Sequence, residues 1–301
     1  MVYNKRLVLA HFWLAFGAFG VAILLGKWQM FIRSPLAAWL HNADLYYRSV
    51  TAHGTVMGYV FPTLVAVGFG YAFTELSLRQ ALIGRRWAWA GCGLIILGSI
   101  LALVPVALGL DTVLYTFYPP MVGHASYYLG VVLVVVGSWI WVALMGVNLH
   151  ACKRAHPGQP VPLTMFATVA GAYLWGWTAV GAASELLFQI LPVALGWSTT
   201  INAGLSRVLS SWTLHAIVYF WLMPAYIAFY TIVPRAIGGR LNSDTMGRVT
   251  FVLFLVFSMP IGIHHLLPIR KSVPGSSSSI RSSLRWSPCP SCSRCSPSAH
   301  R

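Results

Sequence analysis

RVLSSWTLHAIVYFWLMPAYIAFYTIV, residues 207–233, is the stretch that decides the fold. After Arg207, its first residue, it contains no acidic or basic side chain other than a histidine. A helix of about 20 apolar residues crosses roughly 30 Å of hydrocarbon. Because lipid offers the backbone no hydrogen-bond partner, a run of this length must satisfy its own backbone as a helix. The stretch therefore predicts a transmembrane helix.

The rest of the chain has the same character. Of its 301 residues, 57% are hydrophobic and 8% are charged, and its mean hydropathy is +0.71. These values lie outside the usual range of soluble proteins. Runs long enough to span a bilayer cover residues 7–31, 50–74, 87–110, 124–147, 163–192, 207–233 and 248–268. The sequence therefore predicts an all-α fold, a polytopic transmembrane bundle of about seven helices.

Basic residues predict the orientation of these helices. They gather in alternate loops, whereas the opposite loops hold chiefly Arg33 and Arg48. The basic loops contain Lys5, Arg6, Arg79, Arg85, Arg86, Lys153, Arg154, Arg235, Arg240 and Arg248. Since cytoplasmic loops are enriched in Lys and Arg, we expect a cytoplasmic N-terminus. The net charge of +15 then reflects topology, and the lack of an aromatic-interleaved basic patch argues against nucleic acid as a partner.

Residues 1–267 and 268–301 differ sharply in composition. The second segment, PIRKSVPGSSSSIRSSLRWSPCPSCSRCSPSAHR, is rich in Ser, Pro, Arg and Cys, a composition that forms neither a membrane span nor a core. We therefore expect a transmembrane bundle over 1–267 and a disordered, non-homologous tail over 268–301. A further hypothesis is that the tail is a frame-shifted reading of the gene, because a neighbouring frame can spell membrane-like sequence again. Resequencing across the codon for Pro268 tests it.

Four histidines share one depth in the predicted bundle. At 1.5 Å per residue, His53 lies roughly 8 Å below the outer start of its helix, and His215 lies about 12 Å below Arg207. His264 and His265 lie roughly 5 Å below the outer end of the last helix. Ionisable side chains inside a membrane are costly, so each is a functional candidate by default.

Three of these imidazoles form a candidate metal site. Neighbouring residues of a helix point about 100° apart, so His264 and His265 can both reach one ion only near a helix end. The apolar run does end there. With His215 they offer three nitrogen ligands, which suit copper or zinc better than magnesium or calcium.

Tyrosines extend the face of His215 along its helix. Tyr219, Tyr226 and Tyr230 follow at intervals close to whole turns of about 3.6 residues. Such a stripe is typical of a proton route toward the cytoplasm, and equally of tyrosines that pack between helices or at the membrane interface. Glu185, a lone carboxylate within its span, is a candidate for proton handling or for a hydrogen bond to a buried donor.

Four motifs resemble subunit I of the heme-copper oxygen reductases, and within them the B-type terminal oxidases. They are YYRSVTAHG (46–54), LYTFYPPMVGH (114–124), WTLHAIVYFWLMPAY (212–226) and GIHHLL (262–267). The resemblance runs from about residue 46 to 267. It implies that His53 is an axial ligand of a low-spin b-type heme. It also implies that His215, His264 and His265 bind copper beside a high-spin, oxygen-binding heme.

The same resemblance implies an activity. Dioxygen would be reduced to water with electrons from a cytochrome c-like donor, and protons would be pumped outward. Tyr219 would be cross-linked to His215, and Tyr226 and Tyr230 would lie on the proton-uptake route. A dicopper-bearing subunit II would be the partner, and the prokaryotic cytoplasmic membrane the location.

Two departures from the family pattern qualify this expectation. Ala216 stands where the family usually has proline, so we expect a straighter helix there. Family members continue into further spans that carry heme ligands, so we expect the 301-residue chain to be incomplete and inactive by itself.

Other interpretations stay open. A nitric oxide reductase-like member of the superfamily calls for a carboxylate near its metal, and Tyr219 argues against that. A proton- or metal-coupled transporter would use histidines at one depth as a transport site, although inverted repeats are not evident. A third alternative is a non-functional fragment that binds nothing.

Overall fold

The computed structural model of the chain describes residues 2–114, 119 and 121–259. Within these ranges every regular element is helical, which confirms the predicted all-α fold. The elements are α1 (Lys5–Ile32), η1 (Pro35–Leu40), α2 (Ala43–Thr55), η2 (Val56–Val60), α3 (Phe61–Leu78), α4 (Arg85–Ala107), α5 (Ala125–Ala155), α6 (Leu163–Glu185), η3 (Leu186–Ile190), α7 (Leu191–Ala194), α8 (Ala203–Thr231), α9 (Val233–Ala236) and α10 (Asp244–Ser258). Here η1 is a 3₁₀-helix, and η2 and η3 are π-helical turns.

Six helical segments of the described part are long and apolar enough to cross a membrane. They are Lys5–Ile32, Ala43–Leu78, Arg85–Ala107, Ala125–Ala155, Leu163–Ala194 and Ala203–Ala236. Each overlaps one of the first six predicted runs. The second is the longest, with 36 residues, because α2, η2 and α3 join end to end. The seventh predicted run, 248–268, begins within α10 and ends outside the described residues.

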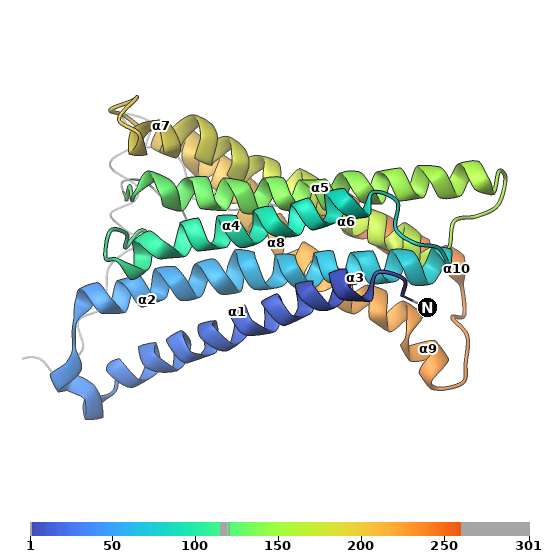
Figure 1. Ribbon diagram of the computed structural model, residues 1–301, viewed down its shortest axis with the longest axis horizontal. Coiled ribbons are helices and arrows are strands. Elements are labelled where there is room, and N and C mark those ends of the chain that lie inside the picture. Colours follow the sequence, from blue (N-terminus) through green and yellow to red (C-terminus); the bar gives the residue numbers. More distant parts are fainter. Residues whose placement is uncertain (1, 115–118, 120, 260–301) are drawn as a thin grey trace, which may run out of the picture. The chain divides into compact units, whose positions relative to one another are not determined.

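Neighbouring helices run antiparallel and side by side (Figure 1). α1 packs along α2 and α3, α4 along α5, and α6 along α8. The α4–α5 pair approaches most closely at two glycines. A Cβ added to Gly98 would lie 2.5 Å from the carbonyl oxygen of Gly130, and one added to Gly130 would lie 2.4 Å from that of Gly98. The two helices therefore touch backbone to backbone, as small residues permit between membrane helices.

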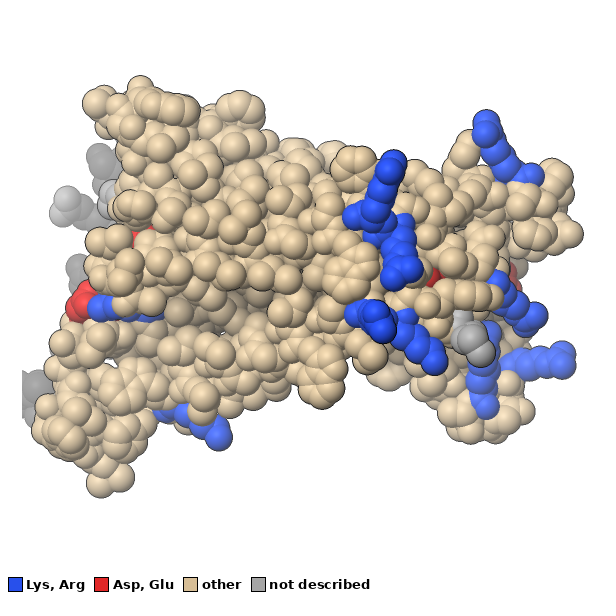
Figure 2. All heavy atoms as spheres, viewed as in Figure 1, with Lys and Arg blue, Asp and Glu red and all other residues tan. Residues whose placement is uncertain are grey.

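Most of the basic side chains visible in Figure 2 gather toward the end of the bundle where the N-terminus lies (Figure 1). Hydrogen bonds join the loops at this end. The Tyr3 hydroxyl donates to the carbonyl of Arg79 (2.8 Å), which ties the N-terminus to the α3–α4 turn. Arg248 donates to the carbonyl of Val161 (2.5 Å), which ties α10 to the α5–α6 loop. The one-sided distribution predicted for the basic loops is thus present in the fold.

The carboxylate of Glu75 is the centre of the polar contacts at this end. It is fully buried, with 0% exposure. Its Oε2 accepts the backbone N–H groups of Tyr3 (2.8 Å) and Asn4 (2.9 Å), and its Oε1 accepts that of Leu82 (3.0 Å) and the side-chain amide of Asn4. A hydrogen bond to a charged group contributes about 1.5–3 kcal/mol. Glu75 therefore holds the N-terminus, α3 and the α3–α4 turn together.

Two π-helical turns interrupt the long helices, one shortly after His53 and one directly after Glu185. In each, the residue that follows the turn bonds to the carbonyl five residues back. Pro62 and Pro192 come next. Proline has no N–H and its ring displaces the carbonyl four residues earlier, so the preceding turn widens by one residue. Such turns are frequent at functional sites.

Replacing Glu75 tests its structural role. Glu75→Ala leaves several buried N–H donors without an acceptor, and each such donor costs about 1–3 kcal/mol. We expect a loss of at least ~3 kcal/mol in the free energy of unfolding, seen as a lower thermal midpoint of the helical circular-dichroism signal in detergent. The control is Asp44→Asn, which removes an exposed ion pair with Arg48 and changes stability by less than about 1 kcal/mol. Equal shifts in the two variants would contradict the assignment.

Candidate functional site

His53 lies on α2 with its ring held through Nδ1. This nitrogen lies 2.8 Å from the carbonyl oxygen of Ala22 on α1. Because a carbonyl oxygen only accepts, Nδ1 donates this bond, and in the neutral imidazole Nε2 is then the nitrogen with the lone pair. Gly26, one turn further along α1, leaves room for the ring, since a Cβ there would lie 3.1 Å from its Cε1 atom. His53 is thus prepared to act as a nitrogen ligand.

Two threonines fix the rotation of α2. Thr51 and Thr55 stand two residues before and after His53, and therefore face the opposite side of the helix. Thr51 Oγ1 accepts the backbone N–H of Leu114 (2.9 Å), and Thr55 Oγ1 lies 2.7 Å from the hydroxyl of Tyr127. Both threonines are buried. Turning His53 away would break both bonds.

Asp111 orders the α4–α5 loop, which contains Leu114 and leads into α5 with Tyr127. It is 2% exposed, and its Oδ1 accepts the backbone N–H of His124. The preceding N–H, that of Gly123, donates to the hydroxyl of Tyr128 (2.8 Å). Burial raises the pKa of the Asp111 carboxyl, and the N–H of His124 offsets part of that rise. Sequence reasoning did not single out Asp111, because a lone aspartate in a loop gives no signal of its burial.

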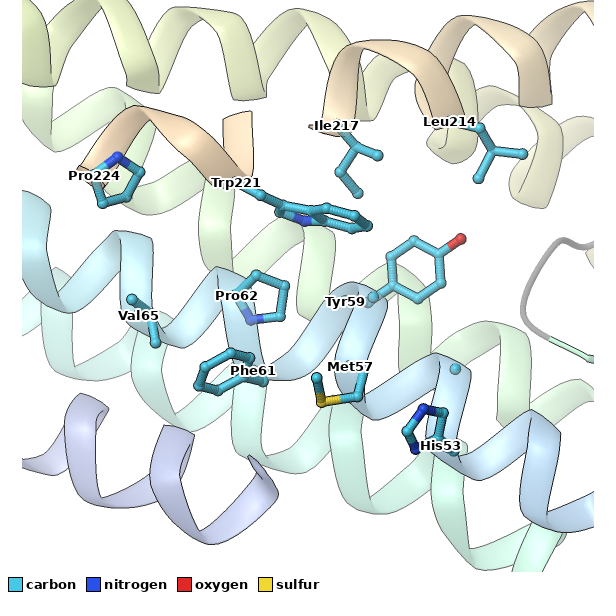
Figure 3. Close-up of a pocket in the computed structure, with 12 residues that line it drawn as sticks. His53, Met57, Tyr59, Phe61, Pro62, Val65, Leu214, Ile217, Trp221 and Pro224 are labelled. Carbon is cyan, nitrogen blue, oxygen red and sulfur yellow. The ribbon is translucent and has the colours of Figure 1, made fainter. Parts of the chain in front are cut away.

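A cavity of about 630 Å³ opens beside His53 (Figure 3). The continuous helix α2–η2–α3 forms one wall, with His53 and Tyr59, and α8 forms the other, with Ile217 and Trp221. The remaining lining side chains are apolar. Gly58, also in the wall, would meet no atom within 4 Å of an added Cβ. Such a cavity accommodates a large, mostly apolar ligand next to the imidazole ring of His53.

His215 and Tyr219 lie next to each other on α8. Their ring centroids are 5.5 Å apart with an interplanar angle of 46°, as expected for side chains one turn apart. His215 is not among the residues that line the cavity beside His53. Ala216, where a proline was expected from the family pattern, lies buried inside α8, and the proline within this helix is Pro224.

The lower tyrosines of the stripe contact α10. The ring of Tyr226 lies 4.8 Å from that of Phe254, and the hydroxyl of Tyr230 donates to Thr250 Oγ1 (3.3 Å). The two tyrosines therefore have packing partners, and their place on a proton route stays a prediction.

The expected copper ligands are only partly described. His264 and His265 lie outside the described residues, so His215 is the one expected ligand that the structure places. Among the residues that it does describe, no three His, Cys, Asp or Glu side chains gather closely enough to hold a metal ion. The copper site stays a prediction.

Glu185 is fully buried where α6 meets α8. The hydroxyl of Ser206 donates to its Oε1, and that of Ser210 also bonds to the carboxyl group. Of the two roles left open for Glu185, a hydrogen bond from a buried donor is therefore present. The two serines, like the threonines of α2, were missed because hydroxyl residues within an apolar run give only a weak signal.

The fold and these residues can be compared with known proteins. A family model described as "Cytochrome C and Quinol oxidase polypeptide I" matches residues 6–280. The chain belongs to this family.

A curated relative and a solved structure are similar to this chain. Cytochrome c oxidase subunit 1 of Thermus thermophilus is 34% identical over 271 residues, which are 87% of this chain and 48% of the relative. A solved chain from a heme-copper terminal oxidase dimer shares 37% identity, with a TM-score of 0.82 over 87% of this chain and 45% of its own length. The chain thus spans about half the length of these relatives. The structural match confirms the expected subunit I helical bundle.

The pH dependence of stability tests the burial of Asp111. Because its pKa is raised in the folded chain, the folded state binds this proton more tightly than the unfolded state. The free energy of unfolding then falls as pH rises from about 4 through the folded pKa, by at most about 1.4 kcal/mol per pH unit. Asp111→Asn removes this component and still accepts from His124. We expect thermal midpoints of the two proteins to converge at low pH and to diverge across this window. Parallel profiles would contradict the prediction.

Proposed function

We propose that this chain forms part of the catalytic subunit of a B-type, proton-pumping terminal oxidase, which reduces dioxygen to water with electrons from a cytochrome c-like donor. Family membership and the likeness to a heme-copper terminal oxidase support this proposal. The observation that carries it is the imidazole of His53, with Nδ1 bonded to a carbonyl and an apolar cavity alongside.

Partners and location follow from the same proposal. A subunit II with a dicopper centre would deliver the electrons, as the relative's name, cytochrome c oxidase subunit 1, supports. The chain would lie in the prokaryotic cytoplasmic membrane with its N-terminus on the cytoplasmic side. The gathering of basic side chains at that end agrees with such an orientation (Figure 2).

The residues around His53 fit a low-spin b-type heme. A metal-binding histidine usually donates its other N–H to a carbonyl or carboxylate, which fixes the tautomer and orients the ring. In His53 the Nδ1–H group donates in this way to the carbonyl of Ala22. The apolar walls would hold a macrocycle and exclude water, and the space at Gly58 is open to it. His53 would supply a nitrogen ligand to the heme iron. Bound there, heme would supply one-electron transfer.

The contacts between α8 and α10 support copper at His215, His264 and His265. Tyr226 contacts Phe254, and Tyr230, four residues later on α8, bonds to Thr250, four residues earlier on α10. The two helices therefore run antiparallel, and a step of four residues along one matches a step of four residues along the other. His215 stands eleven residues before Tyr226, and His265 stands eleven residues after Phe254. A helix that continued α10 in the same register would bring the histidine pair to the depth of His215. Three imidazole ligands suit copper. Copper bound there would be a second redox-active metal, in addition to the heme iron.

Tyr219 and the tyrosines below it would move protons. Tyr219 is adjacent to His215 and would be the tyrosine covalently joined to it, with a phenolic proton held near the metal. Tyr226 and Tyr230 continue the face toward the basic end of the bundle, and Thr250 adds a hydroxyl bonded to Tyr230. This succession of hydroxyls supports a proton-uptake route along the α8–α10 contact.

The alternatives fit less well. A nitric oxide reductase-like site requires a carboxylate near its metal, whereas the ring beside His215 is that of Tyr219. A proton- or metal-coupled transporter would need no large apolar cavity beside His53. An oxidase and a transporter differ in colour, because the oxidase binds heme and the transporter does not.

Heme binding tests the role of His53. The full chain, purified from membranes, is expected to show heme absorbance bands, and His53→Ala is expected to lose the bands of the heme that this histidine binds. Gly26→Ala places a methyl group 3.1 Å from the ring and disturbs its orientation, so heme affinity falls by about tenfold or more. Gly20→Ala is the matched control on the same helix, because nothing lies within 4 Å of its Cβ. A colourless chain would favour the transporter, and equal affinity of the two glycine variants would refute the role given to the ring's orientation.

Copper content tests the other ligands. His215→Ala and His264→Ala are expected to lose copper, measured by elemental analysis of the purified protein. Tyr219→Phe is expected to keep its copper, because the phenol is not a ligand, yet to abolish oxygen consumption in the assembled oxidase. Unchanged copper in both histidine variants, or full oxygen consumption by the phenylalanine variant, would defeat these assignments.

A further inference from the structure

Glu185 is a buried carboxyl group that the proposed heme and copper sites do not use. Its side chain is 0% exposed, at the end of α6 and directly before the π-helical turn η3. The only other π-helical turn in the described residues follows the helix of His53, the proposed heme ligand. Since such turns often mark functional sites, the position of Glu185 calls for an explanation.

The two oxygens of this carboxyl group have different surroundings. Oε1 accepts a hydrogen bond from the hydroxyl of Ser206 on α8, and the hydroxyl of Ser210, one turn further, also bonds to the group. Oε2 is buried, and none of the described residues donates a hydrogen bond to it. An ionised carboxylate in such a place is very costly, and the neutral acid costs much less. The geometry favours a neutral carboxylic acid with its proton on Oε2.

The charges nearby do not favour the ionised form either. Both ion pairs in the described ranges are i,i+4 pairs on α2 and α10, so no described cation pairs with Glu185. On α8, Arg207 is adjacent to Ser206 but exposed. On α5, the titratable group that interacts with Glu185 is the phenol of Tyr128, which is neutral near pH 7. An unpaired intramembrane carboxyl is a functional candidate by default.

Hydroxyl groups lead from Glu185 toward His215. Ser211 follows Ser210 and stands one turn before His215 on α8, so it begins the face that His215 and Tyr219 continue. Its hydroxyl is buried and has no hydrogen-bond partner among the described residues. No hydrogen bond to the described residues therefore fixes this hydroxyl in one rotamer.

Close helix packing keeps this line of hydroxyls enclosed. A Cβ added to Gly181 on α6 would lie 2.5 Å from the carbonyl oxygen of Leu209, so α6 and α8 touch along their backbones. Next to this contact, Thr213 Oγ1 donates to the carbonyl of Thr178 (2.7 Å) and accepts the N–H of Ala182 (2.6 Å). These bonds satisfy Thr213 and the backbone groups next to the close contact, whereas the hydroxyls of Ser206 and Ser210 bond to the acid.

We propose that Glu185 is a protonated acid that exchanges its proton, through Ser210 and Ser211, with the site formed by His215 and Tyr219. In each exchange the carboxyl group turns to bring its O–H to the Ser210 hydroxyl, and the Ser211 hydroxyl turns toward Ser210. The O–H bond of the acid breaks as the Ser210 oxygen accepts the proton, Ser210 gives its own hydroxyl proton to Ser211, and a returning proton re-forms the acid. No electrons move. The acid itself follows from the described contacts, whereas its use at the His215 site rests on the proposed oxidase function.

Infrared spectroscopy of the purified full chain tests the acid directly. The chain has only five acidic residues, so the carbonyl-stretch band of one protonated carboxyl is resolvable by difference. At neutral pH we expect this band in the wild type and its loss in Glu185→Gln. Asp44→Asn is the matched control, because Asp44 is exposed and ion-paired with Arg48, so its replacement should leave the band in place. If Glu185→Gln does not fold, Glu185→Asp is used, and we expect the band to be retained at a shifted position.

Two further variants test the hydrogen bonds and the relay. Ser206→Ala removes a donor to Oε1, so the band should move to higher wavenumber. Ser211→Ala interrupts the line of hydroxyls, so the deuterium exchange of the acid in heavy water should slow severalfold. No acid band in the wild type, or exchange unaffected by Ser211→Ala, would overturn the proposal.

Heme absorbance measured on the same samples separates this inference from the proposed function. A chain that binds heme but shows no acid band contradicts only the role given to Glu185. A chain that shows the acid band but never binds heme contradicts only the oxidase. In heme-loaded protein, reduction should change the band in the wild type and leave the spectrum of Glu185→Gln unchanged in this region. A band indifferent to reduction would overturn the link to the His215 site.

Discussion

Hydrocarbon provides no hydrogen-bond partners, so every polar atom within this bundle must find its partner in the protein. The long helices satisfy the backbone. Side chains meet the same demand at a few points, where the oxygens of Glu75 accept three backbone N–H groups and Nδ1 of His53 meets the carbonyl of Ala22. At Glu185 the acceptors outnumber the donors, and a bound proton is the simplest way to restore the balance. The polar groups of the bundle thereby position the atoms proposed to react.

Much of the fold could be predicted because it depends on length and periodicity alone. Apolar runs located the first six spans, and the four-residue spacing of His215 and Tyr219 placed their rings together. The first and last residues of each span were harder to predict. The second span extends to Ala43–Leu78, beyond the predicted 50–74, because its outer turns contain polar residues that hydropathy assigns to a loop although they remain helical. The π-helical turns also escaped prediction, since they arise where proline meets a buried helix.

In the candidate site, too, some residues could be predicted from the sequence and others could not. His53 could be identified from its motif, but Ala22 and Gly26, which orient its ring, lie on another helix. The threonines of its own helix are likewise held by distant partners, Leu114 in a loop and Tyr127 on α5. Such contacts depend on the tertiary structure, so they cannot be predicted from the local sequence. The copper pair lies outside the described residues and remains a prediction, supported by the register between α8 and α10.

The two π-helical turns have a consequence for how this family diverges. Each adds one residue to a turn without adding rotation, so deleting a single residue there would restore an ordinary α-helix and leave the outer and inner segments in the same angular phase. A one-residue gap at these positions in an alignment is therefore a change in the width of one turn rather than a change of angular phase. Homologues with such a gap would present the same faces of the helix to the interior on both sides of the deleted residue.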